Sequence, residues 1–158
     1  TAGFPDILLL REGGKPDPFS HIPFPKPYIP RKLTWEIEER MDAEGEAFKP
    51  LDEDSVLAGI VGAHEAGCEA IAVCLLWATV NPEHELRVGE LIASELPEMP
   101  YTLAHQLNPV VREYRRASST AIDASLKPLM QDYIGQLDDD LTAAGFGGHL
   151  HHNLSILY

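Results

Sequence analysis

The apolar run at residues 69–77 constrains the fold more than any other stretch of this chain. Eight of its nine residues are apolar, and they do not alternate with polar residues. A strand has this composition when helices cover both of its faces, as in a parallel sheet. A buried helix segment is the alternative, but nine residues are short for a helix and helix-capping residues stand on both sides. We therefore expect a central strand here.

The residues that follow this run predict the start of a helix. Asn81 can cap it, Pro82 fits its first turn, and Glu83 and Glu85 lie where the helix dipole favours carboxylates. The helix should end at Pro97. A helix that directly follows a strand is typical of folds in which strands and helices alternate along the chain.

Before the central strand, the pattern predicts a hairpin and another helix. Residues 33–38 alternate apolar and polar side chains, and residues 46–49 return after a turn at 42–45. Asp52 caps the helix that follows, and Gly67 ends it.

Beyond Pro97, residues 101–104 predict a strand that should lie parallel to the central one. Asn108-Pro109 should open a last helical region, which residues 118–120 interrupt and in which Pro128 marks a kink or a junction of two helices. A brief helix or turn is expected at residues 7–10.

These elements give an α/β fold: a partial mixed sheet, made of a β-hairpin and parallel strands, with helices on its faces. We divide the chain into an N-terminal turn with a Pro-rich extended arm (1–31), an α/β domain (32–148) and the start of a truncated strand (149–158). Six prolines between residues 16 and 30 exclude regular structure in the arm. A Pro-rich ligand for a partner domain is the alternative role of this arm.

Charge and composition exclude several functions. Twelve basic residues against twenty-five acidic ones give a net charge of −13, which argues against nucleic acid and anionic membranes as partners. No apolar run approaches the length of a membrane span and no leader is visible, so we expect a cytoplasmic protein. Cys68 and Cys74 are expected to be reduced thiols.

Few residues carry recognisable chemistry. Neither Gly-x-Gly-x-x-Gly nor the Walker pattern is present, and so no phosphate-cradling loop is predicted. The three histidines at 149, 151 and 152 lack an adjacent carboxylate, whereas zinc needs three or four ligands, and we expect no metal site. Strand 101–104 ends next to His105, and Arg112 and Glu113 belong to the early part of the helical region that Asn108-Pro109 should open. Ligands collect at such strand ends in open α/β sheets, which makes these three residues candidates for lining a cleft; a surface helix with ion pairs is the alternative.

Several blocks of the sequence resemble the hydantoinase/5-oxoprolinase family, in its A-type, ATP-dependent subunit. They fall in the order and spacing of the latter part of the family's N-terminal region, and cover the chain to about Gly148. The blocks are Gly3-Phe4-x-Asp6, Ala72-Val73-Cys74, Asn81-Pro82-Glu83-His84-Glu85, Arg112-Glu113-Tyr114-x-Arg116-x-Ser118-Ser119-Thr120 and Ala124-x-Leu126-x-Pro128.

The resemblance implies part of an ATPase subunit with an actin/sugar-kinase type of fold. Such enzymes open cyclic amides, or carboxylate acetone or acetophenone, at the expense of ATP with magnesium, together with a B-type subunit. The family's Asp-x-Gly-Gly-Thr phosphate loop is absent from this chain. The resemblance therefore implies a fragment that is inactive alone. A stand-alone protein-binding or anion-binding α/β module is the alternative, and a metal-dependent hydrolase built on the terminal histidines is a third.

Two departures refine the resemblance. Residues 10–14 stand where oxoprolinase-like members have Ile-Gly-Arg-Gln, which favours the N-methylhydantoinase or the acetone and acetophenone carboxylase branches. Ala104-His105-Gln106 stands where the family often has Ser-His-Glu, so His105 is present without its neighbouring carboxylate.

Overall fold

The computed structural model describes residues 1–10 and 26–148. Its centre is a pair of parallel strands, β3 (Ile71–Val73) and β4 (Tyr101–Leu103), which pair directly from Ile71 with Tyr101 to Val73 with Leu103. The predicted central strand and its parallel neighbour are therefore confirmed, although β3 is shorter than the apolar run.

Helices cover both faces of this parallel pair, as the unbroken apolar run predicts. On one face, α2 (Glu53–Glu65) and α3 (Glu83–Glu95) supply the core side chains. The buried core joins Val73, Leu75, Leu103 and Ala78 to side chains of both helices, namely Val56, Ile60, Val88, Leu91 and Ile92. The other face meets α5 (Glu113–Ala143), where Thr102 donates a hydrogen bond to the buried Asp123 (2.6 Å).

The helix boundaries near the sheet follow the predicted capping residues. The Asp52 carboxylate accepts the Asp54 N–H at the start of α2, and Gly67 lies beyond its end with φ +71°. Asn81 Oδ1 accepts the Glu83 N–H (3.0 Å) at the start of α3. The remaining short helix at the N-terminus, α1 (Ile7–Leu10), is also as predicted.

The predicted hairpin exists, but its first strand lies later in the chain. Strand β1 (Arg40–Met41) pairs antiparallel with β2 (Ala47–Lys49), around a turn with Gly45 at φ +85°. Within the described residues, β1 and β2 pair only with each other, as do β3 and β4.

The strand predicted at residues 33–38 is wrong. A 3-10 helix, η1 (Arg31–Leu33), precedes an extended segment whose backbone groups bond elsewhere. The Ile37 carbonyl accepts the Ala2 N–H (2.8 Å), and the Glu38 N–H donates to Ser55 Oγ (3.1 Å). Trp35 and Ile37 pack on glycines of α2, so the alternating pattern records packing against a helix without strand pairing.

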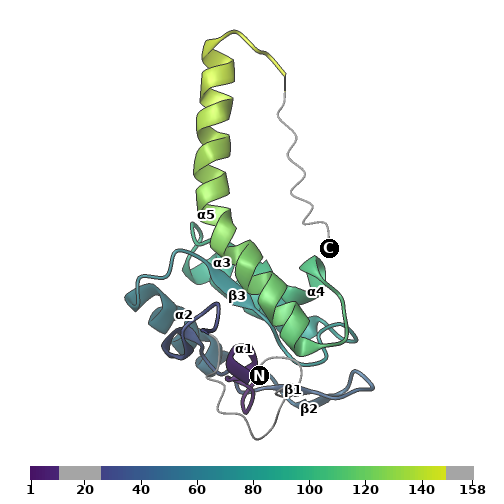
Figure 1. Cartoon of the computed structure of the whole chain (residues 1–158). Coiled ribbons are helices and arrows are strands. Elements are labelled where there is room, and N and C mark those ends of the chain that lie inside the picture. The colour runs from purple at the N-terminus through teal and green to yellow at the C-terminus, as the bar shows by residue number, and fades with distance from the viewer. Residues whose placement is uncertain (11–25, 149–158) are drawn as a thin grey trace, which may run out of the picture.

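The last helical region also differs from its prediction. A short helix, α4 (Ala104–Leu107), follows β4 directly, and α5 begins at Glu113 instead of near Asn108-Pro109. The hydroxyls at 118–120 do not interrupt α5, since Thr120 Oγ1 donates back to the Arg116 carbonyl (2.7 Å). The helix is continuous through Pro128 and changes direction about midway (Figure 1).

Two predicted segments lie largely or wholly outside the described residues. Most of the Pro-rich arm falls in residues 11–25, and the terminal histidines fall in residues 149–158. In the two described stretches, no helix is both long and apolar enough to cross a membrane.

Candidate functional site

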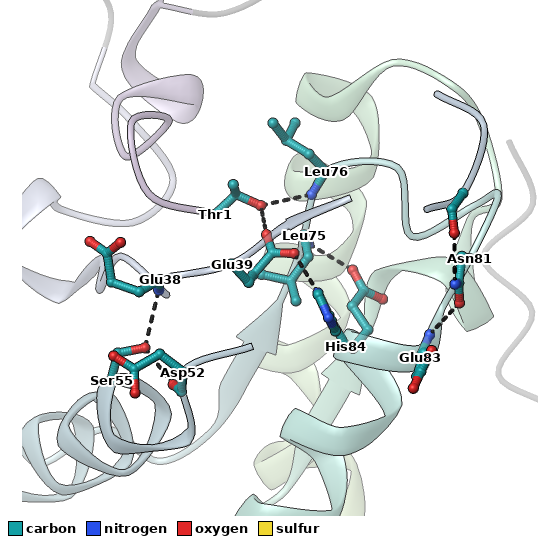
Figure 2. A network of polar contacts seen from close by, with 12 residues as sticks. Thr1, Glu38, Glu39, Asp52, Ser55, Leu75, Leu76, Asn81, Glu83 and His84 are labelled. Atoms are coloured by element: carbon teal, nitrogen blue, oxygen red, sulfur yellow. Dashed lines mark hydrogen bonds and ion pairs between the residues drawn. The ribbon is translucent and has the colours of Figure 1, made fainter. Parts of the chain in front are cut away.

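The segment just after β3 is held by polar side chains from three separate parts of the chain. The Leu75 N–H donates to Glu85 Oε1 on α3 (2.7 Å), and the Leu75 carbonyl accepts from Arg116 Nη2 on α5 (2.8 Å). The next N–H, of Leu76, donates to Thr1 Oγ1 (2.9 Å). Figure 2 shows Leu75 and Leu76, with the bond from the Leu76 N–H to Thr1. We call residues 74–77 and the side chains that bind them the polar lock.

Trp77 completes this segment in an uncommon conformation. Its φ of +57° is in the left-handed region, which bulky side chains rarely adopt. The Trp77 carbonyl accepts the N–H groups of both Val80 (2.9 Å) and Asn81 (3.1 Å), which turns the chain toward α3. Backbone strain of this kind persists only where the surroundings hold it, and the polar lock supplies that support.

Two histidine–glutamate pairs meet at the N-terminus of α3. His84 and Glu85 are consecutive and both are buried. His84 Nδ1 lies 2.8 Å from Glu39 Oε2, and Glu39 also accepts a hydrogen bond from the Thr1 hydroxyl (Figure 2). Glu85 Oε2 lies 2.6 Å from His105 Nδ1 and accepts the His105 N–H (3.0 Å). The positive end of the α3 dipole also favours the Glu85 carboxylate.

The Glu85 contact fixes how His105 can act. A carboxylate can only accept, and so Nδ1 of His105 carries the hydrogen that lies between the two groups. In the neutral imidazole, Nε2 is then the acceptor. The His105 side chain keeps 13% of its surface exposed, whereas Glu85 is fully buried. The arrangement is an oriented imidazole beside a buried carboxylate, which can bind or transfer a proton.

Arg116 joins the polar lock to the loop before α5. Its side chain is 1% exposed, and Nη1 donates to the Val110 carbonyl (3.0 Å) while Nη2 binds Leu75. Its Nε has no hydrogen-bond partner among the described residues. Arg116 Nη1 lies 3.9 Å from Glu113 Oε1, so a buried cation is paired with a half-buried carboxylate.

A small pocket opens beside the polar lock. Its empty space is about 280 Å³ including solvent at the open side, and its lining includes Thr1, Cys74, Leu76 and Glu113. Burial raises the pKa of the Cys74 thiol to about 11, an effect that the Arg116 guanidinium partly offsets. Cys74 is therefore a protonated thiol at neutral pH and is unsuited to nucleophilic attack.

The three predicted cleft residues are placed differently. His105 is bound to Glu85, which in turn binds the Leu75 N–H. Glu113 lines the pocket and lies near Arg116, which binds the Leu75 carbonyl. Arg112 is exposed at the start of α5, where its side chain makes no capping hydrogen bond. The carboxylate that is missing beside His105 in the sequence is supplied in space by Glu85.

Sequence reasoning missed Arg116 and the partner role of Glu85. Arg116 is not among the predicted cleft residues, yet small residues recur on one face of α5 at Thr120 and Ala124. That four-residue spacing places Arg116 on the buried face and could have identified it. Glu85 offered no such signal, because its partners are 10 and 20 residues away along the chain.

Comparison with known proteins agrees with this architecture. The hydantoinase/oxoprolinase N-terminal region family matches residues 1–96. Caprolactamase subunit alpha of Pseudomonas jessenii is 34% identical over 141 residues, which are 87% of this chain and 20% of the relative. The acetophenone carboxylase gamma subunit of Aromatoleum aromaticum is 37% identical over 129 residues, which are 78% of this chain and 18% of the relative.

Solved structures extend the likeness to the fold. The crystal structure of ATP-dependent caprolactamase from Pseudomonas jessenii superimposes with a TM-score of 0.76 at 34% identity, covering 87% of this chain and 20% of that one. A nucleotide-free acetone carboxylase gives a TM-score of 0.63 at 29% identity, covering 65% of this chain and 15% of that one. The chain thus spans about a fifth of the length of these relatives. It belongs to the hydantoinase/oxoprolinase family, within that family's N-terminal region.

Proposed function

We propose that this chain is part of the ATP-dependent subunit of an enzyme that hydrolyses a cyclic amide or carboxylates a ketone. The observation that carries the proposal is the structural likeness to ATP-dependent caprolactamase over 87% of the chain. Acetophenone and acetone carboxylase subunits are also among the relatives, and for this reason the proposal includes ketone carboxylation beside cyclic-amide hydrolysis. Because a neutral cyclic amide or ketone reacts slowly with weak nucleophiles, activation of an oxygen by phosphorylation is the chemistry that ATP would supply.

ATP and magnesium would be held outside this chain. The sequence has no phosphate-cradling loop, and among the described residues no group of three or more potential metal ligands gathers. No step of the reaction is assigned to a nucleotide in contact with these residues. This chain would instead shape one wall of the site at the carboxyl ends of β3 and β4.

His105 is the residue that we place at that wall. Glu85 orients its imidazole, and the exposed fraction of the ring leaves room for contact with a substrate or another part of the subunit. In this role His105 would receive or return a proton through Nε2. Arg112 and Glu113 would line the same side, with Glu113 at the pocket beside Leu75.

The relatives also suggest how the parent enzyme is assembled. Besides caprolactamase subunit alpha and the acetophenone carboxylase gamma subunit, they include an acetone carboxylase beta subunit. By analogy, the parent would pair with a B-type subunit to form a heteromer, and it would work in the cytoplasm, where ATP is available.

The first test is to determine the coding sequence on both sides of this chain. An in-frame Asp-x-Gly-Gly-Thr upstream of Thr1 and a reading frame that continues after Tyr158 are expected. The complete subunit, purified with its partner, should then hydrolyse ATP when a cyclic amide or a ketone is added. Stop codons at both ends would contradict the proposal and favour a stand-alone binding module.

The site assignment has its own test in that complete enzyme. His105→Asn, whose amide can still donate a hydrogen bond to Glu85, and Arg112→Ala should lower ATP-dependent turnover much more than the melting temperature. A residue with only a structural role would lower both together. Gln106→Ala, next to His105 in α4, is the matched control and should leave turnover close to wild type.

A further inference from the structure

The second half of α5 carries an apolar surface that no residue of the described stretches covers. Every buried residue of α5 lies between Arg116 and Ala124, and none of its residues beyond Ala124 is buried in the described structure. Figure 1 shows that this second half extends away from the layers formed by the other elements. The exposed part nevertheless contains large apolar side chains, of which Leu129 is 66% and Tyr133 is 61% exposed.

These side chains form one stripe along the helix. At 100° per residue, they fall within about 140° of its circumference and extend over about 28 Å. We call them the α5 stripe; its members are Ile122, Leu126, Leu129, Met130, Tyr133, Ile134, Leu137 and Leu141. The opposite side of the helix is polar, with Gln131, Asp132, Asp138 and Asp139. A helix with this division normally buries its apolar side.

The stripe continues only one edge of the face that packs on the sheet, where Ser119 and Asp123 are buried. Ile122 and Leu126 lie in or next to the packed half of α5, yet each is 37% exposed. They therefore lie outside the face that holds Thr120 and Ala124 against the strands. The stripe also begins before Pro128, so the bend of the helix does not create it. Beyond Ala124, where α5 extends away from the sheet, the stripe needs another surface to cover it.

Charge identifies what can cover the stripe. One lysine accompanies four aspartates between residues 126 and 141, so anionic membranes would repel this helix. A second copy of the same helix would bring aspartates against aspartates, which is unfavourable at an interface. The complementary surface is an apolar groove edged by lysine or arginine side chains.

We propose that the α5 stripe is an internal docking surface, which a basic-edged apolar groove elsewhere in the same, larger subunit covers. This inference rests on the proposed function, since it requires that larger subunit. The chain covers only 20% of caprolactamase subunit alpha, and the remainder of such a polypeptide is tethered to α5. Tethering gives an intramolecular groove a high effective concentration relative to a separate partner.

The test places a photo-reactive benzoylphenylalanine at residue 133 of the complete subunit, in the assembled enzyme. Unlabelled and 15N-labelled enzyme are mixed before irradiation, and linked peptides are identified by mass spectrometry. We expect links from position 133 to peptides of the same polypeptide and of the same isotope. The same probe at Gln131, on the polar side of α5, is the matched control and should give few links.

The other outcomes are equally informative. Links to a partner subunit, links between the two isotopes, or no more links than at residue 131 would each overturn the docking inference. ATP-dependent turnover is measured on the same preparation. It shows whether the docking inference alone has failed or whether the proposed function has failed. Turnover without intramolecular links would leave the function standing alone, whereas intramolecular links without turnover would leave the docking surface alone.

A pair of charge substitutions provides a second measurement. Leu129→Asp should lower the melting temperature of the complete subunit by several degrees, because the new carboxylate would enter the covered groove. Gln131→Asp adds the same charge on the polar side and should leave the melting temperature unchanged. Equal effects of the two substitutions would contradict a covered stripe.

Discussion

The parallel strand pair is stabilised by different physical means on the face that α2 and α3 cover and at its carboxyl end. Toward α2 and α3, Val73 and Leu103 pack among aliphatic side chains such as Ile92. At the carboxyl end of β3, the polar lock replaces this packing with hydrogen bonds and buried charges, including Glu85 and Arg116. Apolar packing is non-directional and tolerates repacking, whereas a buried polar network stabilises only when every member has its partner. The polar lock therefore fixes the position of a few atoms, which is what a functional site requires.

Glu85→Ala should cause the largest loss of stability, and it tests most directly whether the polar lock stabilises this end of the strands. The substitution removes the acceptor of the Leu75 N–H and of both His105 groups. Removing one member of a buried charged network costs about 3–5 kcal/mol. Urea denaturation should show a fall of this size in the free energy of unfolding.

The neighbouring carboxylate Glu83 provides the control for this change. It is exposed and lies on the same first turn of α3. Glu83→Ala should change the free energy of unfolding little, since its side chain is in water. If the two substitutions had equal effects, the polar lock would not be the stabilising feature of this end of the sheet.

Arg116→Met should have the next largest effect. Methionine fills much of the same space but leaves the carbonyls of Leu75 and Val110 without their donor. An unsatisfied buried acceptor costs about 1–3 kcal/mol, and we expect a loss in that range or somewhat above it.

Arg87 offers a surface comparison for the same substitution. Its guanidinium is 44% exposed and pairs with Glu53 (2.7 Å) and Glu90 (2.8 Å). Arg87→Met should leave the midpoint of urea denaturation nearly unchanged, because exposed ion pairs contribute little. A larger loss from Arg87 than from Arg116 would reverse the ranking that burial predicts.

The apolar side of the comparison could be predicted from the sequence, and most of the polar lock could not. The run at 69–77, the caps at Asp52 and Asn81, and the strand at 101–104 depend on local patterns, and each is confirmed. The lock joins residues up to 75 positions apart, such as Thr1 and Leu76, and no periodicity records such pairs. His105 could be identified as a candidate because it follows a strand, but its buried partner could not.

The wrong strand at 33–38 has a related cause. Alternation reports which side chains are buried, and Trp35 and Ile37 are indeed turned toward α2. It does not report which groups bond to the backbone, and here these are Ala2, Asp52 and Ser55 instead of a neighbouring strand. In the same way, the hydroxyls of Ser119 and Thr120 bond to their own helix, whereas a propensity argument counts these residues as an interruption.

Substitutions at two glycines of α2 test how the extended segment with Trp35 and Ile37 packs on this helix, and they should change stability less than Glu85→Ala does. A Cβ added at Gly62 would lie 2.5 Å from Trp35 Nε1, whereas one at Gly59 would lie 3.5 Å from its nearest neighbours. Gly62→Ala should destabilise the protein by about 1–3 kcal/mol through this overlap. Gly59→Ala should stabilise it by about 0.5–1 kcal/mol, because alanine favours the helix. Thermal denaturation should therefore show shifts of opposite sign, and shifts of the same sign would contradict the contact with Trp35.

The smallest effect should be a pH dependence at Cys74, where the apolar and polar regions meet. Its pKa of about 11 in the folded protein lies above the ordinary value of 9.0, because burial disfavours the thiolate. The folded state therefore binds this proton more tightly than the unfolded state, and the associated stability is complete below pH 9 and is lost as pH rises toward 11.

Alkylation of the native protein measures this shift without unfolding it. The rate of iodoacetamide modification at Cys74, followed by peptide mass spectrometry, should still rise about tenfold per pH unit between pH 8 and pH 10. An unfolded control should level off near the ordinary thiol pKa. A native rate that levels off near pH 9 would show that the Arg116 guanidinium fully offsets the effect of burial on the pKa of Cys74. The polar lock would then extend one residue further into the sheet, and its boundary with the apolar core would lie at Val73.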